Sequence, residues 1–273
     1  MGVIDHLLVH PETLVNRDGL ATVFQPSFEA TLRTFLSKFE EVRVQQNVVI
    51  EDENTRAKLP FSLADSDKDW QWRLQSLDLV NQIFKAHPAE TILEIGAWNG
   101  WLSRHLAKNA QLVVAADYFD HAQDGLRTIQ NVANIIPLHT DTSIISETFL
   151  AEGFDFIVLN HCLAFFEDPA AYVESLVPLL KPNGRLIALG CTVYENAHRV
   201  SAKHERETEK FKQAFGFEKF IHPAKGFLDQ KDKHRLQQFG ATFKPYPKLW
   251  KQNVLATFLE YRPKYYLIEY VKG

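Results

Sequence analysis

The stretch TILEIGAWNGWLS (residues 91–103), followed by VVAAD ending at Asp117, decides the fold. Its apolar residues Ile92, Leu93 and Ile95 predict a buried parallel strand. The glycine-bearing segment after them predicts a turn, and residues 101–108 predict a helix. Backbone N–H groups at such a strand–turn–helix junction can approach a polar ligand closely. The apolar run 112–116 predicts a second strand, which delivers the Asp117 carboxylate to the same edge, where it can accept both hydroxyls of a ribose. The pattern therefore predicts a site for a nucleoside-containing cofactor.

The glycine spacing separates two classes of cofactor. A dinucleotide-binding turn has the form G-x-G-x-x-G, which lets a pyrophosphate rest on the backbone. Counted from Gly96, this form requires glycines where the chain has Trp98 and Trp101. The chain instead has Glu94 two positions before Gly96, and the next glycine is Gly100. This arrangement resembles motif I of the class I S-adenosylmethionine-dependent methyltransferases, acidic-x-G-x-G-x-G, with Trp98 replacing the middle glycine. Its large side chain is expected to narrow the methionine end of the pocket.

Three later segments extend this resemblance. They are FDFIVLN (residues 154–160), HCLAFFEDP (161–169) and LLKPNGRLIA (179–188). In order and wording they are similar to the fourth strand, the following loop and the fifth strand of the type 11 group of small-molecule methyltransferases. Asn183 stands where that group has a glycine, and asparagine tolerates the left-handed backbone conformation of such a turn. The resemblance covers roughly residues 70–190.

The alternation of strand and helix patterns predicts the fold class. Strand patterns alternate with helical ones, including a helix expected over residues 121–132, throughout residues 91–190, which predicts a parallel sheet with right-handed crossovers. Residues 241–245 and 264–271 suit the closing strand pair of the same fold. We therefore expect a Rossmann-like α/β protein with a seven-stranded, mostly parallel sheet and helices on both faces.

The remaining segments predict the domain organisation. Residues 1–66 are expected to form an N-terminal cap or a subunit-contact segment, for example in a homodimer, with a helix over residues 28–44 and a short strand over 47–50. Residues 67–273 are expected to form the methyltransferase domain. Within it, residues 191–235 leave the fifth strand at the ligand edge and should form a helical cover over the substrate.

A helical stripe over residues 68–85 precedes the first strand of the predicted sheet. A short loop joins this helix to the strand, so the helix must run antiparallel to it, and its beginning lies at the carboxyl edge where open α/β folds bind ligands. This places Trp70, Trp72 and Arg73 near the mouth of the site, either touching a ligand or packing against the protein.

The resemblance implies a set of residues that bind S-adenosylmethionine: Glu94, Gly96, Ala97, Trp98, Gly100, Asp117, Tyr118, Asp141, Thr142 and Asn160. Gly96 and Gly100 would leave room for the methionine part and the sugar of the cofactor. Glu94 would orient a water molecule or the cofactor amine. Asp117 would accept from both ribose hydroxyls as a charge-assisted pair of bonds, or else cap the next helix.

Four further positions have competing interpretations. Tyr118 either lies along the adenine face or packs in the core. Asp141, with the Thr142 backbone, either accepts from the adenine amino group or caps the following turn. The backbone carbonyl of Asn160 is a candidate acceptor for the methionine amine. His161 is the candidate catalytic residue, either as a general base, because an unperturbed imidazole is half deprotonated near neutrality, or as a residue that lines the pocket.

Composition excludes several other classes of protein. A formal net charge of −4 disfavours an extended nucleic-acid surface, which needs clustered lysine and arginine. The two cysteines, Cys162 and Cys191, are too few for a zinc ribbon, so no metal site is predicted, and they suggest a reducing compartment. No apolar run reaches the roughly 18 residues of a membrane span, and residues 1–10 lack the features of a signal peptide. A cytoplasmic protein without membrane attachment is expected.

These observations together predict an enzyme that moves a methyl group from S-adenosylmethionine to an O, N or C atom of a small-molecule acceptor. One alternative is a nicotinamide-dependent oxidoreductase, which Trp98 and Trp101 disfavour. A second is a non-catalytic subunit that binds S-adenosylmethionine. The fourth strand is not followed by Asn-Pro-Pro-aromatic, which argues against methylation of a nucleobase or of glutamine nitrogen.

Overall fold

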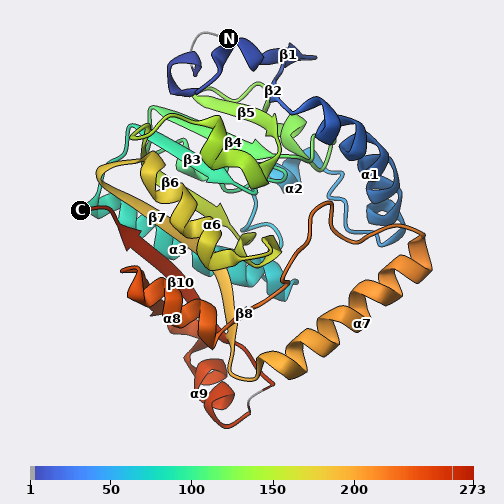
Figure 1. The fold of residues 1–273 in the computed structure, drawn as a ribbon, viewed down its shortest axis with the longest axis vertical. Helices are drawn as coiled ribbons and strands as arrows, with labels where there is room; N and C mark the ends of the chain where they lie inside the picture. Colours follow the sequence, from blue (N-terminus) through green and yellow to red (C-terminus); the bar gives the residue numbers. More distant parts are fainter. Residues whose placement is uncertain (1–3, 260) are drawn as a thin grey trace.

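A computed structural model describes residues 4–259 and 261–273, and its centre is a ten-stranded sheet (Figure 1). The strands are β1 (Val15–Arg17), β2 (Leu20–Val23), β3 (Thr91–Ile95), β4 (Leu112–Asp117), β5 (Ile135–Thr140), β6 (Phe154–Asn160), β7 (Leu180–Tyr194), β8 (Leu228–Asp229), β9 (Thr242–Pro245) and β10 (Lys264–Val271). Their order is β1-β2-β5-β4-β3-β6-β7-β10-β9, with β8 paired to β7. The strands from β2 to β7 in this order are parallel, whereas β1, β9 and β10 pair antiparallel with their neighbours.

This topology confirms the predicted fold class and extends it. The seven expected strands are β3 to β7 with β9 and β10, and the sheet gains β1, β2 and β8. The chain runs outward from β3 to β5 and then returns to β6 on the other side of β3. The carboxyl ends of β3 and β6 therefore flank the point where the strand order reverses, which is where open α/β sheets bind ligands.

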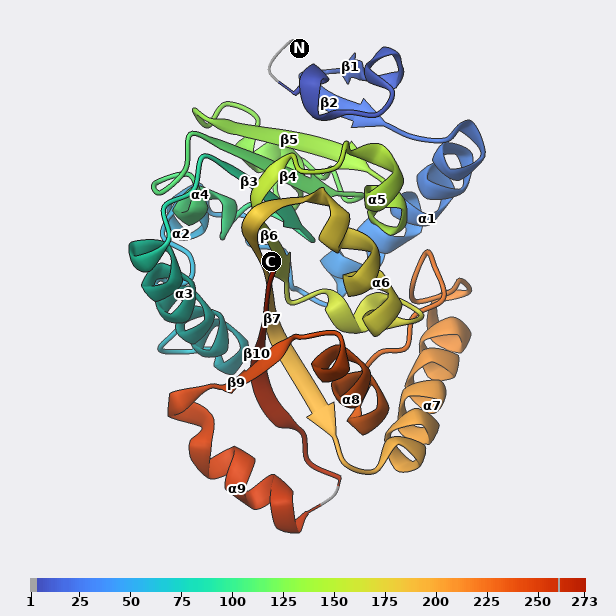
Figure 2. The same ribbon diagram turned by 60° about the vertical axis from the view of Figure 1, so that its left-hand side comes forward.

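Helices cover both faces of the sheet. They are α1 (Pro26–Gln45), α2 (Glu53–Ala57), α3 (Lys68–Ala86), α4 (Ser103–Leu106), α5 (Ile145–Thr148), α6 (Pro169–Leu176), α7 (Ala197–Phe215), α8 (Gln230–Gln238) and α9 (Trp250–Phe258). Figure 2 shows α3 and α6 on opposite sides of the central strands. Alternate strand residues face opposite sides, so Ile92 packs with Leu77 and Val80 of α3, whereas Leu93 packs with Val173 of α6.

Residues 4–66 extend the sheet and close its ligand edge. Strand β2 pairs with β5 in parallel, and α1 lies beside the ends of β4 and β5 (Figure 1). Phe35 and Leu36 of α1 pack against Phe119, which follows β4. The predicted cap begins at residue 1, and its first three residues lie outside the described part of the chain, as does residue 260. The predicted contact with a second subunit stays a prediction.

Three local expectations were wrong. Residues 47–50 form no strand, and the helix expected over 101–108 is reduced to α4. Residues 121–132 contain only a 3-10 helix, η3 (Leu126–Ile129). In this last segment, two other contacts form instead of an α-helix. The buried side chain of Asp124 binds partners outside the segment, and the Leu126 N–H donates to the Phe119 carbonyl at 3.0 Å.

Candidate functional site

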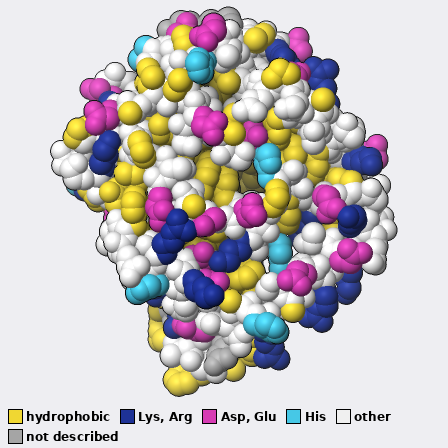
Figure 3. Space-filling view, viewed as in Figure 1, with side chains coloured by type: hydrophobic (Ala, Val, Ile, Leu, Met, Phe, Trp, Pro, Cys, Tyr) yellow, Lys and Arg dark blue, Asp and Glu magenta, His cyan; other side chains and the backbone are white. Residues whose placement is uncertain are grey.

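A cavity of about 810 Å³ opens at the carboxyl edge of the sheet, over the ends of β3, β4 and β6. Its size lies in the upper part of the range for small-molecule sites. Figure 3 shows hydrophobic side chains gathered around the hollow. Four parts of the chain supply most of the wall: α1 with residues 46–50, the start of α3, the strand ends with the loop after β6, and residues 220–223.

The turn after β3 forms the floor of the cavity. Gly96 has φ +76°, and the N–H groups of Gly96 and Ala97 both donate to the Ala116 carbonyl, at 3.0 and 3.3 Å. A Cβ at position 96 would lie 2.9 Å from both Cβ and Sγ of Cys162. Glycine is therefore required here for two reasons, the left-handed backbone and the close approach of the loop after β6.

Gly100 and Ala97 were predicted to bind the cofactor, but neither residue lines the cavity. A Cβ at position 100 would lie 2.3 Å from Cγ2 of Ile129, so this glycine admits the Ile129 side chain instead of a ligand. The Ala97 side chain is fully buried in the core beneath the turn. Both residues shape the turn from behind.

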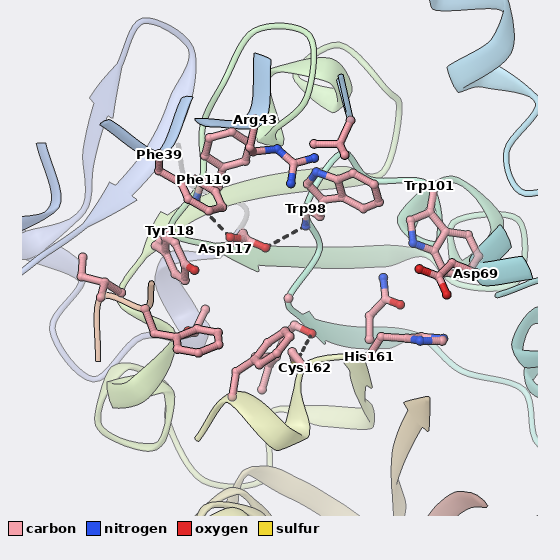
Figure 4. Close-up of a pocket in the computed structure, with 18 of the residues that line it drawn as sticks. Phe39, Arg43, Asp69, Trp98, Trp101, Asp117, Tyr118, Phe119, His161 and Cys162 are labelled. Carbon is pink, nitrogen blue, oxygen red and sulfur yellow. Dashed lines mark hydrogen bonds between the residues drawn. The ribbon is translucent and has the colours of Figure 1, made fainter. Parts of the chain in front are cut away.

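Trp98 is held in place by partners from three separate segments. It adopts a left-handed backbone conformation, with φ +48°. Its indole stacks on Trp70, with ring centroids 5.7 Å apart, and its Nε1 donates to Asp124 Oδ1 at 3.0 Å. The Arg43 guanidinium lies beside the indole (Figure 4), 5.4 Å from its centroid, and forms an ion pair with Asp124. Trp98 thus forms a rigid wall of the cavity.

Asp117 ends β4 with its carboxylate in the cavity wall. It accepts from the Trp98 N–H at 2.7 Å and from the Phe119 N–H at 2.9 Å (Figure 4). Burial raises its pKa to about 6, against the effect of the backbone hydrogen bonds, which favour the ionised form. Tyr118, the next residue, also lines the cavity and packs edge-on against Phe35 of α1. Both predicted residues lie at the site.

Glu94 lies behind the cavity, where its side chain is fully buried. It accepts from Ser103 Oγ at 2.5 Å and from Asn160 Nδ2 at 2.8 Å. Burial raises its pKa to about 8, so the carboxyl group is largely protonated at neutral pH. The hydrogen bond from Asn160 Nδ2 fixes the amide, and the buried Oδ1 has no partner within the described part of the chain although Asn160 lines the cavity. The site therefore holds an unpaired acceptor beside the Gly96 turn.

His161 lines the cavity and ends a chain of hydrogen bonds. The Gly190 N–H donates to Tyr246 Oη at 3.0 Å, which leaves the Tyr246 hydroxyl hydrogen free for Ser76 Oγ at 2.8 Å. Ser76 Oγ in turn lies 3.0 Å from His161 Nε2. Burial, and secondarily the positive charge of Arg73, hold the pKa of His161 well below its usual range. The imidazole is therefore neutral at physiological pH.

Asp141 serves as a cap in this structure. Its Oδ1 accepts from the Ser143 N–H and lies 2.9 Å from His222 Nε2. Asp141 does not line the cavity, whereas Thr142, Ser143 and His222 do. The His222 ring also stacks on Phe28 of α1, with centroids 5.1 Å apart. The side chain predicted to read adenine is thus covered by His222.

The predicted cover over the site lies partly against the loop after β6. The Gly226 N–H donates to the Ala164 carbonyl at 2.7 Å, and the Lys225 N–H to the Phe166 carbonyl at 3.2 Å. These bonds bring residues 220–223 into the cavity wall. Of the predicted cover over residues 191–235, only residues 220–223 line the cavity, and helix α7 does not. Arg73 lies in the wall as the sequence suggested, whereas Arg43 and Ser76, whose helical segments carry no motif, were not predicted.

The polar groups in the cavity fit an S-adenosylmethionine molecule. The glycine floor admits a ligand close to the backbone, Asp117 offers a carboxylate for ribose hydroxyls, and Asn160 Oδ1 offers an acceptor for an ammonium group. Within residues 4–259 and 261–273, no group of three or more His, Cys, Asp or Glu is placed to bind a metal ion. Among the described helices, none is both long and apolar enough to cross a membrane.

Comparison with known proteins gives the family. Residues 62–222, more than half of the chain, match a family model described as "Methyltransferase domain". The chain belongs to this methyltransferase family. It is a class I methyltransferase, an enzyme whose cofactor is S-adenosylmethionine. The match supports the methyltransferase interpretation over the oxidoreductase and the non-catalytic subunit. No curated protein matches the sequence.

Several solved structures resemble this methyltransferase in fold. The N-methyltransferase NodS from Bradyrhizobium japonicum is 17% identical, with a TM-score of 0.48 over 77% of this chain and 99% of NodS. YcgJ from Bacillus subtilis is 15% identical, with a TM-score of 0.47 over 72% and 97% of the two chains. The plantazolicin methyltransferase BpumL, solved with S-adenosylhomocysteine and a desmethyl analogue, is 16% identical, with a TM-score of 0.47 over 81% and 96%. These likenesses describe the fold alone.

Proposed function

We propose that this enzyme transfers the methyl group of S-adenosylmethionine to an O, N or C atom of a small molecule inside the cavity. The observation that carries the proposal is the cavity itself. A polar floor of Gly96, Asp117 and Asn160 continues into a wall of aromatic and aliphatic side chains that α1 and residues 220–223 enclose. An enclosed wall of this kind suits a compact acceptor, and the net charge of −4 offers no support for a nucleic-acid partner.

In this proposal, residues at the floor of the cavity bind the different parts of the cofactor. When bound, S-adenosylmethionine supplies an electrophilic methyl group on a sulfonium. Asp117 would accept from the ribose hydroxyls, Tyr118 would offer its ring to the adenine, and Asn160 would accept from the methionine ammonium group through Oδ1 or its backbone carbonyl. Glu94 supports Asn160 from behind without touching the ligand.

His161 is proposed to position the acceptor. A general base works best when its pKa lies near the operating pH, and burial holds the pKa of His161 well below that range. Its Nε2 is already within hydrogen-bond distance of Ser76 Oγ. Methyl transfer depends chiefly on proximity and in-line orientation, which a fixed neutral imidazole supports by holding the acceptor against the floor of the cavity.

Transfer of isotopically labelled methyl groups tests the proposal. The protein is incubated with methyl-labelled S-adenosylmethionine and a cell extract separated into small molecules, proteins and nucleic acids. Label is expected in the small-molecule fraction, and Asp117→Ala should reduce it. Label that enters only the protein or nucleic-acid fraction would overturn the assignment of a small acceptor, while leaving the cofactor assignment intact.

A further inference from the structure

Arg73 is a charged side chain in the cavity wall that has no polar partner among the described residues. It projects from the second turn of α3, and the structure gives it no hydrogen bond or ion pair to any described residue. Burial lowers its pKa, and the negative charges of Asp69 and Asp67 oppose that effect. An arginine remains charged in proteins, so the cavity contains a partly desolvated cation.

The other arginine in the cavity wall, Arg43, lacks this property. It forms an ion pair with Asp124, whose side chain is fully buried. Two carboxylates act on the Arg73 charge. Asp69 is exposed and forms no ion pair with Arg73, and Asp67 is engaged as the cap of α3, accepting from the N–H groups of Asp69 and Trp70 at 2.7 and 3.2 Å. Removing a charge from water is costly unless the charge is paired, so the guanidinium donors of Arg73 favour an anion that enters the cavity.

The surroundings of Arg73 indicate what kind of molecule would carry the anion. The guanidinium lies 5.0 Å from the ring centroid of Trp70 and 5.8 Å from that of Trp98, which orients its planar fork beside two stacked indoles. Ile50 and Leu63 contribute aliphatic surface to the same wall. Arg73 and His161 line the same cavity, and Trp72, the residue before Arg73, packs edge-on against the His161 ring with centroids 5.0 Å apart.

We propose that Arg73 binds a carboxylate of the methyl acceptor, and that this carboxylate is joined to an apolar or aromatic body. The inference rests on the proposed function and deepens it, because it names a chemical class for the acceptor. Two molecules in the cavity can supply a carboxylate: the acceptor and the methionine part of the cofactor. The fork geometry suits either, and binding measurements separate the two sources.

The acceptor arm uses protein saturated with S-adenosylhomocysteine. Indole-3-acetate and phenylacetate are titrated against their matched amides by calorimetry. Wild-type protein is expected to bind the acids roughly tenfold or more tightly than the amides, and Arg73→Gln should remove this preference. Arg73→Lys should restore part of it, because the charge is kept while the fork is lost. Lys85→Gln, an exposed change of equal charge on the same helix, should leave the preference intact.

The cofactor arm compares S-adenosylhomocysteine with 5′-methylthioadenosine, which lacks the amino-acid carboxylate. If Arg73→Gln loses the preference for acids and keeps its affinity for both nucleosides, the carboxylate belongs to the acceptor, as proposed. A roughly tenfold loss of affinity for S-adenosylhomocysteine alone would assign Arg73 to the cofactor and overturn the proposal. Unchanged results in both arms, with a normal melting temperature, would overturn the carboxylate site. If wild-type protein binds neither nucleoside, the proposed function fails instead, so the two failures are distinguishable.

Discussion

Asp117 accepts the backbone N–H of Trp98 at 2.7 Å, and this bond ties the end of β4 to the turn after β3. The same carboxylate accepts from the Phe119 N–H at 2.9 Å. One side chain therefore fixes the two backbone segments that form the floor of the cavity and also presents a charge to the cavity. Its structural contacts and its proposed role in ribose binding are coupled, so a change at Asp117 should affect both.

Replacing Asp117 with alanine tests this coupling. The affinity for S-adenosylhomocysteine should fall roughly tenfold or more, because a hydrogen bond to a charged group contributes about 1.5–3 kcal/mol. The melting temperature should also fall, since two buried N–H groups lose their acceptor. Asp120→Ala, which removes a partly buried ion pair with Arg127 outside the cavity wall, is the matched control. Normal cofactor binding by Asp117→Ala would show that the carboxylate is only structural.

The raised pKa of Asp117 predicts a pH dependence of binding. Its pKa in the folded protein is about 6, and the ionised form is the stronger acceptor for ribose hydroxyls. Affinity for S-adenosylhomocysteine should therefore weaken as the pH falls through about 6. Asp117→Asn cannot titrate and should show a flatter profile over the same range. Identical pH profiles for the two proteins, measured by calorimetry, would contradict this assignment.

Gly96→Ala and Gly216→Ala form a matched pair, because both glycines have φ +76°. A Cβ at Gly216 meets nothing within 4 Å, whereas one at Gly96 lies 2.9 Å from Cys162. In both variants the strain of a left-handed alanine should lower the free energy of unfolding by about 1–3 kcal/mol. The contact with Cys162 should lower the free energy of unfolding of Gly96→Ala by about 1–3 kcal/mol more, and this variant should bind S-adenosylhomocysteine weakly. Urea unfolding measures the difference in stability between the two variants. Equal losses of stability would show that the Cys162 side chain can move away from the new Cβ at no energetic cost.

Glu94 predicts a pH dependence of stability. Its pKa rises from 4.5 in the unfolded chain to about 8 in the fold, so the unfolded chain ionises first. Wild-type stability should therefore fall as the pH rises from 4.5 through 8. Glu94→Gln has no carboxyl group to ionise and lacks this loss. The free energy of unfolding of Glu94→Gln minus that of wild type should therefore increase by about 2 kcal/mol as the pH rises from about 6.5 to 8.5. A constant difference in urea unfolding would mean that Glu94 ionises without penalty.

His161→Ala separates a positioning role from a general base. Cofactor affinity should stay within a few-fold of wild type, because the nucleoside contacts lie elsewhere in the cavity. Loss of a general base lowers the rate by about 10²–10⁴, whereas loss of a positioning contact should lower chiefly the affinity for the acceptor. We expect the second result. The NMR signal of the His161 ring should also show no titration between about pH 6 and 8.

The features that the sequence predicted are those encoded within short segments. Residues 91–95 and 154–160 are apolar runs bounded by turn residues, so β3 and β6 were predictable. Gly96 and Asp117 belong to a motif whose spacing follows from one strand, one turn and the next strand. Their position at one edge of the sheet then follows from the parallel topology. These residues define the centre of the site.

The features that could not be predicted depend on contacts between distant segments. The hydrogen bond from Tyr246 to Ser76 spans 170 positions and leads to His161. The side chain of Trp98 is held by α1, α3 and Asp124 together, and no local pattern indicates that arrangement. Asp124 itself leaves the helix expected around it because Arg43 and the indole bind it more favourably than solvent does.

Calorimetric titration of the protein with S-adenosylhomocysteine and, separately, with NAD tests the central claim most directly. The left-handed Trp98 occupies the position where a dinucleotide-binding turn requires glycine, and Asp117 faces the cavity behind it. We predict that S-adenosylhomocysteine binds one molecule per chain and that NAD gives no heat of binding. Binding of NAD with no response to S-adenosylhomocysteine would contradict the account.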